Sequence, residues 1–128
     1  TSVAYDVSTI LSGAGLGVLG TDLFLHKEPD SPSNCVTIYG TGQWKQPEID
    51  YNYEYPSVQV RVRRKVGDYK QGELEVMTRM NALHGYVGTI GSVKYHVIIV
   101  TNGPIYMGED GSGRPRWVFN CEIHRSTS

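Results

Sequence analysis

The sequence predicts a single α+β domain, in which two helices pack on one face of a largely antiparallel or mixed β-sheet. Two observations lead to this prediction. Several segments alternate apolar and polar residues, as half-buried strands do, and two other segments repeat their apolar residues at helical spacing. In chain order these segments give α-β-β-β-α-β-β-β, without an internal repeat. A chain of 128 residues is long enough to bury a core as one domain, over residues 1–128.

The first helix is predicted over residues 3–12. Its apolar side chains form one stripe, made of Val3, Val7, Ile10, Leu11 and Ala14. The next residues, "GAGLGVLG" (13–20), contain a G-x-G-x-x-G spacing at 15–20. In dinucleotide-binding folds this motif follows a strand and opens a helix. Here it follows a helix, so we interpret it as the turn that ends the helix.

Two strands are predicted next, over 22–27 and 35–42, with the proline-containing turn "EPDSPSN" (28–34) between them. Residues 40–56 are then predicted to form a long loop. A loop of this length in a small domain is usually functional or partly disordered.

The stretch "YPSVQVRVRRK" (55–65) predicts a third strand with one buried face. Its side chains alternate, because Val58, Val60 and Val62 point to one side and Gln59, Arg61 and Arg63 point to the other. We take the valines as core residues and the polar side chains as the outward face of the strand.

A second helix is predicted within "GDYKQGELEVMTRMNALHG" (67–85), where the apolar stripe consists of Val76, Met77, Met80 and Leu83. Asp68 suits the helix start as a capping residue, and Gly85 suits the position after its end. Two strong strands follow, over 92–100 and 115–125. Between them we predict a short strand and a flexible tip at 107–114.

Composition and charge exclude several classes of protein. The net charge of −1 argues against a protein that coats DNA, because such proteins are usually strongly basic. Cys35 and Cys121 have no C-x-x-C spacing, and we interpret them as reduced thiols. No apolar run approaches the ~18 residues of a membrane span, and the first residues lack the pattern of a signal peptide. We therefore expect a soluble protein, made in the cytoplasm, that does not enter a membrane.

The residues that carry chemistry do not cluster in the sequence. His26, His84, His96 and His124 lie on four different elements and have no H-x-x-x-H or H-x-E spacing. Glu73 and Glu75 do not share a face of their helix, and the acids at 109–110 lack the spacing of an EF-hand. No catalytic triad or phosphate-binding loop is present. The prediction is a protein without metal, cofactor or catalytic site, and not an enzyme.

Positive charge is concentrated in Arg61, Arg63, Arg64 and Lys65, which hold a third of the 12 Lys and Arg residues of the chain. Three interpretations are open: a solvated strand face, a phosphate contact helped by tyrosines that stack bases, and a contact between subunits. The third has a specific basis, because an acidic and aromatic loop comes just before the strand. Its candidate interface residues are Trp44, Glu48, Asp50, Tyr51, Tyr53 and Glu54. A loop of this kind on one protomer could pair head-to-tail with the basic strand of the next, and such contacts close into a ring.

Taken together, the motifs form a recognisable succession. The first helix ends in "GAGLGVLG", and "TDLFLHKEPDSPSNCVTIYGTG" (21–42), "YPSVQVRVRR" (55–64), the 67–85 helix and a closing pair of strands follow. In this order and spacing, over roughly residues 5–125, the chain resembles the tail-terminator (minor capsid) family of long, non-contractile-tailed bacteriophages. Other neck proteins, namely a head-completion stopper or a connector adaptor, are alternatives. A further alternative is a single-stranded nucleic-acid-binding module that would use Tyr51, Tyr53 and Tyr55 together with the four basic residues at 61–65.

The resemblance implies a structural virion protein of the tail and neck, assembled in the host cytoplasm. Such proteins form a six-fold, hexameric ring that caps the tail tube, stops its polymerisation and provides the joining surface for the head. The implied partners are further copies of the chain, the tail tube protein and a head-tail stopper or connector protein. Double-stranded DNA passes through the lumen without being read, and a nearly neutral protomer is compatible with this because each neutralised phosphate adds affinity.

Overall fold

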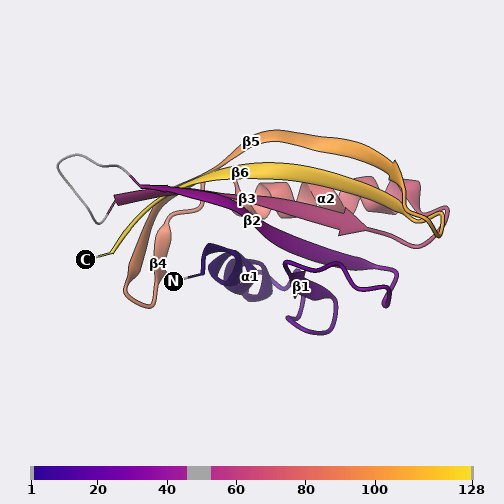
Figure 1. The fold of residues 1–128 in the computed structure, drawn as a ribbon, viewed down its shortest axis with the longest axis horizontal. Coiled ribbons are helices and arrows are strands. Elements are labelled where there is room, and N and C mark those ends of the chain that lie inside the picture. The colour runs from indigo at the N-terminus through magenta and orange to yellow at the C-terminus, as the bar shows by residue number, and fades with distance from the viewer. Residues whose placement is uncertain (1, 46–52, 128) are drawn as a thin grey trace.

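The computed structural model describes residues 2–45 and 53–127. Within these ranges the chain forms two helices and six strands, in the order that the sequence predicted (Figure 1). The elements are α1 (Val3–Gly13), β1 (Leu23–Leu25), β2 (Cys35–Lys45), β3 (Tyr53–Arg63), α2 (Tyr69–Leu83), β4 (Gly88–Ile90), β5 (Val93–Glu109) and β6 (Pro115–Thr127).

The described strands form one mixed sheet in the order β1-β2-β3-β6-β5-β4. β1 runs parallel to β2, and all the other neighbouring strands are antiparallel. Figure 1 shows β2, β3, β5 and β6 running along the long axis of the molecule. The short strands β1 and β4 lie at the two margins of the sheet, so most of the width of the sheet is made by four long strands.

One face of the sheet forms the core together with both helices. In register across the sheet, Ile38 lies opposite Val60, and Val60 lies opposite Phe119. These residues belong to a single buried cluster with Val7 of α1 and Val76 of α2. The predicted α+β fold with two helices on one face is therefore confirmed, and the alternating valines of β3 point into the core as expected.

The described parts of the predicted long loop at 40–56 are instead paired strands, and its residues 46–52 lie outside the described residues. β2 continues to Lys45 and β3 begins at Tyr53, and the two strands remain paired as far as Lys45 and Glu54. The predicted strand ended at residue 42, but β2 continues beyond it, and Gly40 and Gly42 only form a bulge in the ladder. Cross-strand pairing outweighs such local preferences, because propensity is only a weak guide where a partner strand is available.

The last three strands also differ in detail from the prediction. The additional short strand is β4, which precedes β5, whereas we had placed it after residue 100. β5 instead continues through this region to Glu109 and keeps its pairing with β6 across several bulges. Residues 107–109 of the predicted tip are thus part of a strand, and the turn that follows is held by Asp110, whose side chain accepts hydrogen bonds from the backbone of Ser112 and Arg114, both at 2.9 Å.

The start of α2 is arranged differently from the predicted cap. Asp68 occupies the N-cap position, but its side chain does not cap the helix. Its Oδ2 instead accepts a hydrogen bond from Nε of Arg64 at 2.8 Å.

The predicted apolar stripe of α2 is only partly buried. Met77 is exposed, whereas Val76 and Leu83 are buried. The helix therefore presents part of its apolar surface to solvent.

Candidate interface surface

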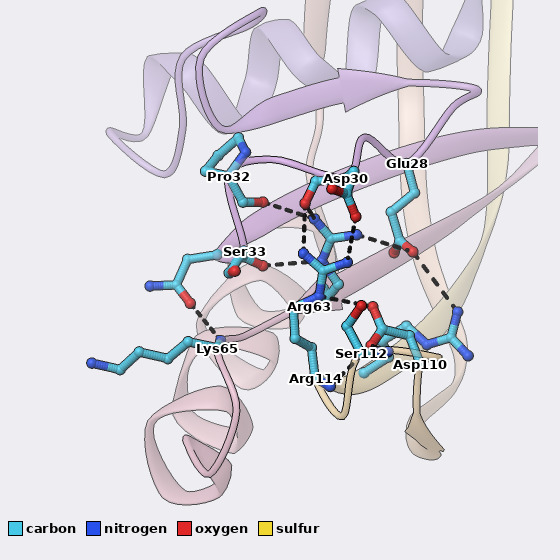
Figure 2. A network of polar contacts seen from close by, with 11 residues as sticks. Glu28, Asp30, Pro32, Ser33, Arg63, Lys65, Asp110, Ser112 and Arg114 are labelled. Carbon is cyan, nitrogen blue, oxygen red and sulfur yellow. Dashed lines mark hydrogen bonds and ion pairs between the residues drawn. The ribbon is translucent and has the colours of Figure 1, made fainter.

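The basic cluster at 61–65 is not one exposed surface. Arg63 points away from the valines, as the alternation predicted, yet only 2% of it is exposed. The reason is the segment 27–34 between β1 and β2, which lies over this end of the outer sheet face and covers Arg63 (Figure 2). The expectation that Arg63 lies on an outward-facing surface is therefore wrong.

The guanidinium of Arg63 contacts that segment through all three of its nitrogens. Its Nε donates a hydrogen bond to the carbonyl oxygen of Ser33 at 3.0 Å, and one terminal nitrogen donates to the carbonyl oxygen of Pro32 at 2.7 Å. The other terminal nitrogen lies 3.5 Å from Oε1 of Glu28. Figure 2 shows these groups converging on the guanidinium from the loop. Arg63 thus ties the loop to β3 within one protomer.

A second arginine ties the same loop to the turn between β5 and β6. Nε of Arg114 lies 2.9 Å from Oδ2 of Asp110, and its terminal nitrogens contact the carbonyl oxygen of Asp30 at 2.5 Å and Oδ1 of Asp30 at 3.2 Å (Figure 2). Desolvation acts to raise the pKa of Asp110, but hydrogen bonds from the backbone of Arg114 and Ser112 and from the guanidinium outweigh it and hold this pKa below its usual value. The turn and the loop are therefore joined in one polar network.

The other basic residues of the cluster have separate environments. Arg64 forms the ion pair with Asp68, and Arg61 is half-buried with its guanidinium 5.0 Å from the centre of the Tyr39 ring. Lys65 is exposed, and only its backbone nitrogen is engaged, by Oδ1 of Asn34 at 2.7 Å. Of the four predicted basic residues, Lys65 is the one whose charged group is exposed in the described part of the chain.

The predicted acidic and aromatic partners are also divided. Glu54 pairs with Arg125 at 2.9 Å inside the protomer, next to Tyr95 and Asp6 in a buried polar network. Tyr53 stacks on His96 with ring centres 4.8 Å apart, on the half-exposed outer face of the sheet. The predicted residues Glu48, Asp50 and Tyr51, and the side chain of Trp44, lie outside the described residues, so their contacts stay a prediction.

A different surface was missed by the sequence analysis. A groove of about 590 Å³ lies between α2 and β5, and it is lined by Tyr69, Lys70, Glu73, Leu74, Tyr106 and Trp117. Leu74 is 52% exposed and Tyr106 is 49% exposed. The aromatic rings form a continuous wall, with ring centres 6.2 Å apart for Tyr69 and Tyr106 and 5.4 Å apart for Tyr106 and Trp117. A hydrogen bond to Glu109 raises the pKa of Tyr69 to about 12.

The sequence did contain a signal for the groove. Leu74 and Met77 are three positions apart and cannot both share the buried stripe with Val76 and Leu83. The excess of apolar residues on α2 indicated a second apolar surface. What the sequence did not show is that Tyr106 and Trp117 of two paired strands would lie beside it.

The described residues contain no group of three metal-binding side chains in proximity.

Cys35 and Cys121 are both buried and free. They lie on opposite faces of the sheet, because Cys35 is in register with Arg63 and Cys121 is in register with Val58. Burial raises the pKa of both thiols, that of Cys121 to about 12. Neither thiol is therefore arranged as a nucleophile.

In the described ranges, no helix is both long and apolar enough to cross a membrane.

Comparison with known proteins identifies the family. A search of curated proteins gave no match. A family comparison matches residues 10–127 to the family described as "Bacteriophage tail terminator protein". This match spans nearly the whole chain, including all of β1 to β6 and α2. The chain therefore belongs to the bacteriophage tail terminator family, whose members are structural proteins of the phage tail.

Proposed function

We propose that this protein assembles into a hexameric ring that caps the phage tail tube, stops tube polymerisation and forms the joining surface for the head-neck connector. The observation that carries the proposal is the family match over residues 10–127. In this proposal the role is structural rather than enzymatic, the partners are the tail tube protein and a head-tail stopper or connector, and assembly takes place in the host cytoplasm.

The surface of the protomer supports an assembling protein. Within the described residues, β5 is paired with β4 only over Val93–Tyr95, and its residues 101–107 are all exposed. Large apolar side chains gather there, namely Ile105, Tyr106 and Met107, close to the groove beside α2. Exposed apolar surface of this kind is typical of a protein contact site.

The charges of the protomer support passage of DNA without tight binding. The net charge is −1, and the guanidinium groups of Arg63, Arg64 and Arg114 are engaged by groups of the same protomer. These guanidinium groups are not free to neutralise phosphates, and each neutralised phosphate would add salt-dependent affinity. The same observation argues against the alternative of a single-stranded nucleic-acid-binding module, because two of its four proposed cations are engaged in this way.

The experiment is assembly with purified tube protein. Light scattering and negative-stain microscopy should show closed rings of the free protein or rings seated on one end of each tube, and adding the protein during tube growth should shorten the tubes. A protein that stays monomeric and leaves tube growth unchanged would contradict the proposal. Binding to connector rings without binding to tube ends would instead identify a stopper or adaptor.

A further inference from the structure

We propose that the groove beside α2 receives residues 46–52, the segment between β2 and β3, from a second copy of this chain. The inference rests on the proposed ring and names the contact that would hold it together. It is argued from the position of the groove, the ends of the hairpin strands and the charges of the two segments.

The paired strand ends that flank residues 46–52 and the groove lie at opposite ends of one protomer. The hairpin strands are paired as far as Lys45 and Glu54, and Glu54 is in register with Arg125. The groove lies at the other end, where Tyr106 is in register with Trp117 and Trp117 with Val62. Val62 lies eight positions after Glu54 in β3, so the two residues are about 27 Å apart at a rise of about 3.4 Å per residue. Figure 1 shows the hairpin end and the end of the sheet near the start of α2 far apart along the long axis.

This separation determines the type of contact. The strand ends that flank residues 46–52 lie about 27 Å from the groove of their own protomer, whereas a neighbour placed head-to-tail would bring these strand ends to the groove. Such a contact joins two different surfaces, so each protomer still has one free 46–52 segment and one free groove. Repeated contacts of this type close into a ring or continue as a filament.

The composition of the two segments is complementary. Residues 46–52 read "QPEIDYN", with two acids, Glu48 and Asp50, two large apolar or aromatic residues, Ile49 and Tyr51, and no basic residue. The groove offers an aromatic and aliphatic wall with Lys70 at its lining, and Lys65 is exposed just before α2. Glu73 is the single acid among the lining residues. Aromatic side chains in apolar pockets are typical centres of protein interfaces, and charges at the rim orient the partners.

Site-specific cross-linking tests this contact directly. Asp50→Cys and Lys70→Cys are combined in one chain and treated with a short bis-maleimide; both native thiols are buried, so they give little background. The expected result is a ladder of covalent oligomers that ends at the closed ring. A mixture of the two single variants should give only dimers, because each chain then carries one reactive end.

The matched control replaces Lys70→Cys by Val87→Cys, since Val87 is 65% exposed and lies before β4, outside the groove. Rings that form normally but cross-link no better than this control overturn the inference and leave the proposed function standing. Cross-links from Lys70→Cys to tube protein alone also overturn it, and they assign the groove to that partner. A chain that never assembles overturns both.

Interface variants provide an independent measure. Leu74→Asp should weaken assembly by about tenfold or more, as expected for a residue near the centre of an interface, whereas Val87→Asp should have no effect. Glu73→Lys should strengthen assembly severalfold because it removes the one acid facing the acidic segment 46–52. Lys70→Glu should weaken assembly and Asp50→Lys should restore it; independent effects of these two changes would contradict the pairing. Unchanged circular dichroism verifies that each variant folds.

Discussion

Arg63 and Pro32 are joined by a hydrogen bond of 2.7 Å between a guanidinium nitrogen and a backbone carbonyl oxygen, which anchors the loop 27–34 to β3. We predict that Arg63→Ala lowers the free energy of unfolding by about 3 kcal/mol, because it leaves the half-buried carbonyl oxygens of Pro32 and Ser33 without their donor. Of its ion pairs within the described residues, Glu28 would keep only the one with Arg116, at 3.8 Å. Urea unfolding followed by circular dichroism measures the change.

Arg61→Ala is the matched control for this prediction. Arg61 is on the same strand and the same face, two residues away, but it is half-buried and contacts Tyr39 mainly through its guanidinium. Arg61→Ala should lower the free energy of unfolding by about 1 kcal/mol or less. Equal losses for the two variants would show that Arg63 does not hold the loop.

Arg61 and Arg63 also show what the alternation of apolar and polar residues can predict about a strand. Period-two alternation correctly assigned the valines of β3 to the core and the arginines to the other side of the sheet. Alternation describes one strand alone, so it cannot show that a loop from 30 positions earlier in the chain crosses that side. The exposed basic surface that we predicted is therefore reduced to Lys65 and part of Arg61.

The lengths of the strands also depend on residues that are distant in the sequence, which local patterns do not show. The sequence placed β2, β3, β5 and β6 correctly but ended β2 too early and divided β5, because glycine and proline are turn residues when they are judged locally. In the folded chain these residues are carried within strands by pairing to long neighbours, as at Gly40 and Gly42 of β2. Helical periodicity was more reliable, because most of the contacts that define a helix are local.

Gly72 is predicted to tolerate no larger side chain. A Cβ atom at this position would overlap the six-membered ring of Trp117, which packs against the start of α2. We expect Gly72→Ala to lower the free energy of unfolding by about 1–3 kcal/mol through overpacking, although alanine is the better helix former. Gln71→Ala, on the exposed side of the same turn, should leave stability unchanged or raise it slightly. Thermal unfolding of both variants measures this difference, and an increase in stability for Gly72→Ala would contradict the prediction.

Asp110 should make stability depend on pH in the acidic range. Its folded-state pKa lies below its usual value of about 3.9, so its contribution is present above that value and is lost as the pH falls through the folded-state pKa. We expect Asp110→Asn to be less stable than the original chain at pH 7, and the difference to shrink below about pH 4. Urea unfolding at several pH values provides the measurement, with Glu73→Gln, an exposed acid on α2, as the control. A difference that does not change with pH would show that the charge of Asp110 contributes nothing.

Tyr95 is predicted to stabilise the fold through Asp6. The Tyr95 hydroxyl donates to Oδ2 of Asp6 at 2.5 Å and accepts a hydrogen bond from Arg125 at 3.2 Å, all in the buried interior. Tyr95→Phe leaves the Asp6 carboxylate without this donor, so we expect a loss of about 1–3 kcal/mol in the free energy of unfolding. Tyr5→Phe, which changes an exposed tyrosine of α1, is the control and should cost nothing measurable. The double variant Asp6→Ala, Tyr95→Phe should lose less than the sum of the single changes, because the carboxylate that needed the hydroxyl is gone. Additive losses in urea unfolding would mean that the two side chains act independently.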